Sequence, residues 1–285
     1  MSQGPDFREF DVIKAHANGN DFLFIEEAEV GAEDAAAIAR AACHRHRGIG
    51  ADGLIFYRRT ATGGAMKLFN ADGSVAEVSG NGVRCLAAIL IELEPDVSLG
   101  HETVIETDGG IKILTLLKAR SPCYSFRAFM GAPQGLEQVQ LDVAGEPVTA
   151  VTLSVGNPQC VVLTSKLDEE QFRRLGPILA THSVFPKGAN VDFVEVERPG
   201  TLRILIWERG VGPTTASGTG ACASAVAAAA YGGAARLVNV ISPGGSQQVE
   251  WTADGIYLVG WAGITLRGRW CDLEGRRPDG GERGC

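Results

Sequence analysis

Two stretches of the chain align with each other without a gap: MKLFNADGSVAEVSGNG at residues 66–82 and ILIWERGVGPTTASGTG at residues 204–220. In both, a serine precedes a Gly-x-Gly sequence that opens an apolar, helix-like run, so that Ser79 falls on Ser217. Self-similarity of this kind is the sequence signature of a repeated structural unit. We therefore expect Ser79 and Ser217 to hold equivalent places in two copies of one fold and to face one shared small-molecule site.

Shorter matches extend the repeat toward its N-terminal side. At the same spacing, residues 50–52 (GAD) fall on residues 188–190 (GAN), and one residue off that spacing residues 19–20 (GN) fall on residues 156–157 (GN). Matches that keep one order and nearly one spacing indicate a duplication of the whole half rather than of one loop.

Each half shows the same order of elements, with period-2 alternation in the strands. The two helices that follow the glycine-rich loops are apolar on nearly every face, which is typical of a helix buried on all sides. The sequence thus predicts an α/β (α+β) fold of two pseudo-symmetric halves, each a wrapped, mostly antiparallel sheet around a central helix. We place the halves at residues 1–125 and 126–270, with a flexible tail at 271–285. The last strand could pair back onto the first half, which the sequence alone does not decide. The expected strands cover residues 10–14, 22–25, 53–58, 65–70, 103–117, 123–131, 148–154, 161–163, 191–196, 202–208 and 247–269, and the helices cover 32–42, 83–93, 169–179 and 221–230.

Composition narrows the class of partner. The chain has 285 residues, 45% of them apolar, and a net charge of −8. An acidic balance argues against nucleic acid or an anionic membrane as partner, because phosphate binding favours a basic face. The N-terminal residues show no signal peptide, and no apolar run is long enough for a membrane helix. Seven scattered cysteines without a C-x-x-C pair fit neither a zinc site nor a disulfide scaffold, so we expect no metal and a cytoplasmic protein.

Both glycine-rich loops are suited to hold an anion. Gly80-Asn81 and Gly218-Thr219 lie at expected helix N-termini, where backbone N–H groups and the helix dipole favour a carboxylate. The simpler interpretation is that Ser79 and Ser217 are ordinary helix N-caps, each stabilising its helix by about 1 kcal/mol. The symmetric placement of the two loops favours a site between the halves.

Two groups that face each other across a substrate suit proton transfer at a tetrahedral carbon, one removing a proton and the other delivering one. Such groups need a pKa near the working pH. A thiol beside a helix N-terminus meets this requirement, whereas a serine hydroxyl acts only with a neighbouring base.

A set of short segments spread along the chain is distinctive: residues 16–22 (HANGNDF), 47–54 (RGIGADGL), 69–74 (FNADGS), 80–82 (GNG) with Arg84-Cys85, 156–158 (GNP), Asn190 and 208–210 (ERG). With these segments the chain resembles the diaminopimelate epimerase family from Phe10 to about Gly268. The resemblance implies two pseudo-symmetric α/β halves and a cofactor-independent isomerase of lysine biosynthesis that interconverts LL- and meso-diaminopimelate with a cysteine thiolate/thiol pair. It is also compatible with a homodimer.

Carried over onto this sequence, the resemblance assigns three kinds of role. Glu208 is a partner to the substrate's non-reacting amine or to the catalytic group. The backbone at Gly80-Asn81 and at Gly218-Thr219 cradles the reacting carboxylate. Contacts to the substrate's polar ends fall to Asn20, Asn70, Asn157, Asn190 and Arg209, although Asn20 and Asn157 could instead be turn asparagines and Arg209 could pair with Glu208 or another acid.

Three positions depart from the family pattern. The family's catalytic cysteines fall on Ser79 and Ser217, and Gln159 stands where histidine usually follows the Asn-Pro sequence. Glutamine does not titrate and so supports no proton relay. Cys85 and Cys222 lie in the helices just beyond the loops, and we expect both to face the packed core rather than to replace the missing thiols.

Three hypotheses follow. The chain is an epimerase whose cysteines were replaced by serine, a diverged relative that catalyses another isomerisation, elimination or rearrangement of a small acid, or a protein that binds its ligand without turnover. In the second hypothesis, the base is Asp21, Asp52, Asp72 or Glu208. The first hypothesis predicts little exchange of the diaminopimelate Cα proton in heavy water, and some recovery after serine is changed to cysteine at positions 79 and 217.

Overall fold

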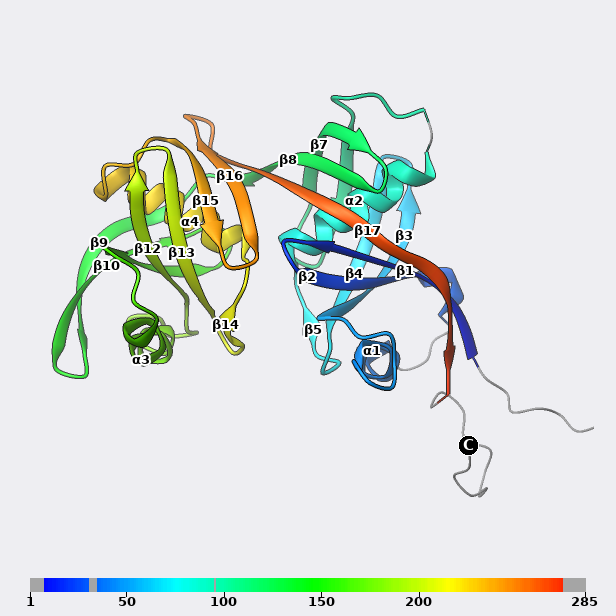
Figure 1. Cartoon of the computed structure of the whole chain (residues 1–285), viewed down its shortest axis with the longest axis horizontal. Coiled ribbons are helices and arrows are strands. Elements are labelled where there is room, and N and C mark those ends of the chain that lie inside the picture. The colour runs from blue at the N-terminus through cyan, green and yellow to red at the C-terminus, as the bar shows by residue number, and fades with distance from the viewer. Residues whose placement is uncertain (1–7, 31–34, 95, 274–285) are drawn as a thin grey trace, which may run out of the picture.

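Two buried helices organise the fold, one in each half of the chain. The computed structural model describes residues 8–30, 35–94 and 96–273, and Figure 1 shows two strand-rich lobes. Helix α2 (Gly80–Leu93) lies in the core of the first lobe, and helix α4 (Gly218–Tyr231) lies in the core of the second. Both are apolar on nearly all faces, because the surrounding strands bury every side. The predicted wrapped sheet around a central helix is confirmed.

The first lobe places a second helix outside its sheet. Helix α1 (Ala35–Cys43) packs on the outer face, so the sheet has one core against α2 and another against α1. The strands of this lobe are β1 (Arg8–Ala17), β2 (Asn20–Glu26), β3 (Gly53–Thr60), β4 (Gly63–Asn70), β5 (Val75–Ala76), β6 (Glu102–Glu106), β7 (Lys112–Arg120) and β8 (Cys123–Gly131).

The second lobe repeats this plan with helix α3 (Glu169–Ala180) on the outer face. The side chain of Asp168 caps α3 by accepting hydrogen bonds from the backbone N–H groups of Glu170 and Gln171. The strands are β9 (Gln134–Val143), β10 (Glu146–Ser154), β11 (Pro158–Thr164), β12 (Asn190–Arg198), β13 (Thr201–Glu208), β14 (Gly212–Thr214), β15 (Leu237–Ser242) and β16 (Gly245–Trp251).

Strand pairing carries the same symmetry. Strands β2 and β3 are parallel and are joined through α1, as β11 and β12 are joined through α3. Strands β4 and β6 are parallel and are joined through α2, as β13 and β15 are joined through α4. The remaining pairs are antiparallel, so the sheet is mixed but mostly antiparallel. In consequence, α2 and α4 follow equivalent hairpins and begin at equivalent ends of their sheets.

The last strand, β17 (Ile256–Asp272), joins the lobes. It pairs with β16 of the second lobe and with β8 and β1 of the first, and Figure 1 shows it running from one lobe into the other. Cys271 and Asp272, expected in the tail, belong to this strand, because Trp270 stacks on Phe10 and Asp272 forms an ion pair with Arg8 at 3.1 Å. The rest of the expected tail, residues 274–285, lies outside the described residues.

Some element boundaries differ from the expectation. The single strand expected at 103–117 is the hairpin β6–β7, because Gly110 adopts a left-handed φ of +89° at its turn. The strand expected at 247–269 likewise divides at Gly255 (φ +141°) into β16 and β17. The sequence reading missed β9 and β15, and β9 carries many polar side chains toward solvent. No helix within the described residues is long and apolar enough to span a membrane.

Candidate active site

The first residues of α2 and α4 meet at a single guanidinium group. A side-chain carbon added at Gly80 would lie 4.0 Å from Nη1 of Arg84, and one added at Gly218 would also lie 4.0 Å from that atom. Both helix N-termini therefore open onto the same place between the lobes, and their backbone N–H groups and dipoles add positive potential there.

Ser79 and Ser217 both cap their helices. The hydroxyl oxygen of Ser79 accepts a hydrogen bond from Gly82 N at 3.1 Å, and that of Ser217 accepts one from Gly220 N at 3.2 Å. Ser79 is half-buried, and Ser217 is buried at 7% exposure. Capping occupies one lone pair of each oxygen, so each hydroxyl proton remains available for a second partner.

The surroundings of the two serines differ in charge. In the second lobe the hydroxyl of Ser217 interacts with the carboxyl of Glu208, the last residue of β13, and lowers its pKa. The equivalent residue at the end of β4 is Asn70, whose amide donates to Ser74 at 2.9 Å. Burial raises the pKa of Glu208 above its ordinary value, and the Ser217 hydroxyl partly offsets that shift. Only Ser217 therefore has a titratable partner at this position.

A second acid lies on the same side of the site. Asp192 on β12 is completely buried, and both of its carboxylate oxygens lack a hydrogen-bond partner in the described part of the chain. Oδ1 of Asp192 would lie 2.7 Å from a side-chain carbon on Gly220, in the first turn of α4. Burial, with a smaller contribution from Glu208, raises the pKa of Asp192 to about 8. Asp192 is therefore neutral at pH 7 and lies behind the Ser217–Glu208 pair.

Sequence reasoning missed Asp192, although a signal was present. In the first lobe the same place is held by Ile55, whose Cδ1 would lie 2.8 Å from a side-chain carbon on Gly82. The signal was an acid within an apolar strand at a position where the other copy of the repeat carries isoleucine. Burying an acid costs free energy, so its presence there points to a role other than packing.

Three polar residues form a row across neighbouring strands of the second lobe. Gln159 on β11 pairs in register with Asn190 on β12, and Asn190 accepts a hydrogen bond from the backbone N–H of Arg209, the residue after Glu208 at the end of β13. Gln159 is buried and donates to Oδ1 of Asn157 at 2.7 Å, whereas its own Oε1 has no partner among the described residues. The row and Asn157 thus bring four of the predicted site residues together at one end of these strands.

Arg209 follows Glu208 directly but points elsewhere. Its backbone N–H donates to Oδ1 of Asn190 at 2.9 Å, and its guanidinium donates to the carbonyl of Lys187 at 2.8 Å. The described residues show no ion pair between Arg209 and an acid, so they give no support to the alternative that Arg209 pairs with Glu208 or another acid. The exposed guanidinium keeps further donors available for a ligand.

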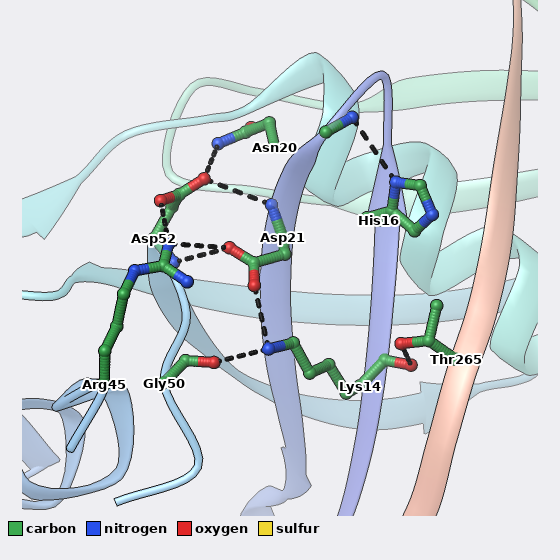
Figure 2. Close-up of polar contacts among 9 residues, drawn as sticks. Lys14, His16, Asn20, Asp21, Arg45, Gly50, Asp52 and Thr265 are labelled. Atoms are coloured by element: carbon green, nitrogen blue, oxygen red, sulfur yellow. Dashed lines mark hydrogen bonds and ion pairs between the residues drawn. The ribbon is translucent and has the colours of Figure 1, made fainter. Parts of the chain in front are cut away.

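A cluster of charged residues fixes Asn20 in the first lobe (Figure 2). Asp52 accepts from the amide of Asn20 at 3.0 Å and from Arg45 at 2.8 Å. Asp21 forms ion pairs with Arg45 at 3.3 Å and with Lys14 at 2.9 Å. These contacts connect the β1–β2 turn to the segment before β3. Asn20 is therefore held in place by residues outside its own turn.

Asn20 is also connected to the start of α2. Asn81 is buried at 4% exposure and donates to Oδ1 of Asn20 at 3.2 Å. Nη2 of Arg84 donates in turn to Oδ1 of Asn81. Hydrogen bonds therefore run from the buried guanidinium through two asparagines to the charged cluster.

The first-lobe acids considered as bases are committed to other contacts. Burial alone would raise the pKa of Asp21, but Lys14 and Arg45 together lower it below its ordinary value. Hydrogen bonds from Ser74 lower the pKa of the exposed Asp72. Carboxylates held ionised in this way are weak bases, which leaves Glu208 as the acid best suited to proton transfer.

The helix cysteines lie in the core, as predicted. Cys85 and Cys222 are both completely buried, and burial raises the pKa of each thiol to about 12. A neutral, buried thiol is a poor base, so neither replaces the thiols that the resemblance led us to expect at Ser79 and Ser217.

Thr219 lies beside Ser217, with 3.4 Å between the two hydroxyl oxygens.

Comparison with known proteins decides the family. The sequence pattern of the family described as diaminopimelate epimerase matches residues 12–134 and 151–264. The chain belongs to the diaminopimelate epimerase family. It is 38% identical to the diaminopimelate epimerase of Desulfitobacterium hafniense, covering 90% of this chain and 97% of the relative. It is also 38% identical to that of Desulforudis audaxviator, covering 90% and 98%.

Solved structures outside this family share the fold. A hydroxyproline epimerase from Agrobacterium vitis superposes with a TM-score of 0.66 at 16% identity, covering 94% of each chain. A methylitaconate-delta-isomerase superposes with a TM-score of 0.67 at 12% identity, covering 94% of this chain and 97% of the other. At these identities the likeness shows a shared fold.

Proposed function

We propose that this chain is a cofactor-independent amino-acid isomerase that acts on diaminopimelate or a closely related amino acid and removes its Cα proton from the Ser217 side only. Membership of the diaminopimelate epimerase family supports the amino-acid substrate class. The arrangement that carries the one-sided chemistry is the buried carboxyl of Glu208 beside Ser217, which Ser79 lacks because Asn70 stands in the equivalent place.

The proton path on that side is short. The hydroxyl oxygen of Ser217 takes the Cα proton while its own proton passes to Glu208, and the electron pair left on Cα moves into the substrate's α-carboxylate. The N-termini of α2 and α4 stabilise the developing negative charge. Glu208 suits this role because burial raises its pKa toward the working pH, and a base of matched pKa contributes about 10²- to 10⁴-fold to the rate.

The opposite face lacks a matching donor. Ser79 caps α2, and its neighbours at the equivalent places are the neutral Asn70 and the apolar Ile55. A hydroxyl without an adjacent base or acid transfers protons poorly. The expected chemistry is therefore removal and return of a proton on one face, with slow inversion.

Proton exchange in heavy water tests this proposal. LL- and meso-diaminopimelate are incubated separately with the chain, and deuterium at Cα and the change of configuration are both followed by NMR. We expect exchange to outrun inversion and to be lost in Glu208→Gln. The control Glu197→Gln, which alters an exposed acid paired with Arg203 on β12 and β13, keeps the exchange. Inversion as fast as exchange would refute the one-sided mechanism.

A second function has a specific observation in its favour. Because the acids with raised pKa values, Glu208 and Asp192, lie beside Ser217, a single base there could move a proton between two carbons on the same face of an unsaturated small acid. This hypothesis predicts isomerisation of such an acid and no Cα exchange in diaminopimelate. Binding of diaminopimelate without either reaction would instead support a protein that only binds its ligand.

A further inference from the structure

Arg84 is a charged residue inside an apolar helix. It lies one turn into α2, is 1% exposed, and has Gly260 of β17 against the plane of its guanidinium. A side-chain carbon on Gly260 would lie 2.8 Å from Nε and 3.0 Å from Cζ of Arg84. The glycine at that position therefore leaves just enough room for the guanidinium to lie flat between the helix and the strand.

The guanidinium has no anionic partner among the described residues. Its side-chain hydrogen bond goes to the neutral Asn81, and Nε has no partner. The titratable groups that act on it are the thiols of Cys85 and Cys222, whose raised pKa values keep them neutral. A buried cation without a counter-ion is costly, and proteins normally pair it.

The free end of the side chain points to the place where an anion would bind. The hydrogen bond to Asn81 uses Nη2, whereas Nη1 lies 4.0 Å from side-chain carbons added at Gly80 and at Gly218, the first residues of α2 and α4. The remaining contributors to positive potential there are the two helix N-termini. One carboxylate placed between the helix ends would thus meet a guanidinium donor as well as backbone N–H groups.

We propose that Arg84 is a binding residue that supplies the buried counter-charge for the substrate's α-carboxylate between the two helix N-termini. This inference rests on the proposed function for the identity of the substrate, but the anion site itself does not depend on turnover. Arg84 donates to Asn81, which in turn donates to Asn20. One side chain would therefore both bind the carboxylate and hold the asparagines of the first lobe in position.

Titration with acetate, the smallest carboxylate, tests the site without any reaction. The backbone amides of Gly80 and Gly218 are followed by NMR in the full chain, with neutral acetamide as the matched ligand. We expect both amides to shift with one Kd for acetate and not to respond to acetamide. Arg84→Met should weaken acetate binding roughly tenfold or more, since a charge-assisted hydrogen bond is lost, and Arg84→Lys should retain most of it.

A second variant protects the test against a folding defect in Arg84→Met. Gly260→Ala leaves the charge in place but displaces the guanidinium, so it should weaken acetate binding. Gly268→Ala on the same strand should not, because its side-chain carbon would make only an ordinary contact of 3.9 Å with Leu266. Equal acetate affinity in the wild-type chain, Arg84→Met and Gly260→Ala would overturn the proposal. Separate shifts of Gly80 and Gly218 with two different Kd values would also overturn it. Failure of Cα exchange in diaminopimelate leaves these outcomes unaffected and counts only against the proposed function.

Discussion

Asp192 and Ile55 occupy the same place in the two lobes, each against the first turn of its central helix. Their side chains would meet a carbon added at Gly220 and at Gly82 at 2.7 and 2.8 Å, respectively. The duplicated fold thus keeps its geometry while one copy places an acid where the other places an apolar side chain. Together with Glu208, which stands where the first lobe has Asn70, this difference places two acids with raised pKa values beside Ser217.

Stability should report the buried acid directly. The pKa of Asp192 is raised to about 8, so the folded chain holds a proton that the unfolded chain releases above about pH 4. The free energy of unfolding should therefore fall as pH rises from 5 to 8, by about 1.4 kcal/mol per pH unit for one such group. In Asp192→Asn, the unfolding free energy measured with urea should fall less steeply with pH than in the wild-type chain.

Asp192→Ile is the matched variant, because it installs the residue of the other lobe. It should be more stable than the wild-type chain at pH 8 and should lose the same part of the pH slope. Identical slopes in the wild-type chain and both variants would show that Asp192 is ionised in the folded protein.

The rate of Cα exchange should follow the ionisation of Glu208. Burial raises the pKa of this acid above its ordinary value, so exchange should increase as pH rises through that raised pKa and then level off. Asp192→Asn replaces a protonated carboxyl beside Glu208 with a neutral amide, so the midpoint of the pH–rate curve should move little. A midpoint at the ordinary pKa of a glutamate would mean that the base is an exposed acid instead.

The charged cluster of the first lobe should affect binding more than stability. Asp52→Ala removes the 3.0 Å hydrogen bond to Asn20 and the ion pair with Arg45. Since Arg45 and Asp52 are exposed, we expect a loss of less than about 1 kcal/mol in unfolding free energy but a weaker Kd for diaminopimelate by calorimetry. The control Glu106→Ala breaks the exposed ion pair with Arg58 and should leave the Kd unchanged.

Restoring thiols should restore two-sided chemistry. In a chain with both Ser79→Cys and Ser217→Cys, each thiol lies at a helix N-terminus, which lowers its pKa and increases the thiolate fraction. We expect interconversion of LL- and meso-diaminopimelate to rise well above that of the wild-type chain. If the folded double variant binds diaminopimelate and still fails to invert it, another substrate is indicated.

Much of this arrangement could be predicted from the sequence, because the duplication repeats its patterns twice. The apolar runs after Ser79 and Ser217 predicted the two buried helices, and the alternating segments predicted the strands around them. The hairpin at Gly110 and the strand β9 were harder, since a turn inside an alternating segment and a solvent-exposed strand leave weak hydrophobic patterns.

The roles of the charged residues of the site could not be predicted from the sequence alone. Arg84 and Asp192 stand inside apolar segments, which is visible in the sequence, but their meaning depends on partners from distant segments. The contact of Arg84 with Gly218 and Gly260 joins three elements, and the burial of Asp192 depends on the packing of α4 against β12. No pattern within one segment determines such contacts.

The most direct test of the one-sided site compares Ser217→Ala with Ser79→Ala. Both variants lose a helix cap and about 1 kcal/mol of stability, so folding effects are matched. Initial rates of deuterium incorporation at Cα of diaminopimelate are measured for each variant by NMR. We predict that Ser217→Ala loses at least about tenfold more exchange than Ser79→Ala, because only Ser217 relays its proton to Glu208. Equal losses, or a larger loss in Ser79→Ala, would contradict the account.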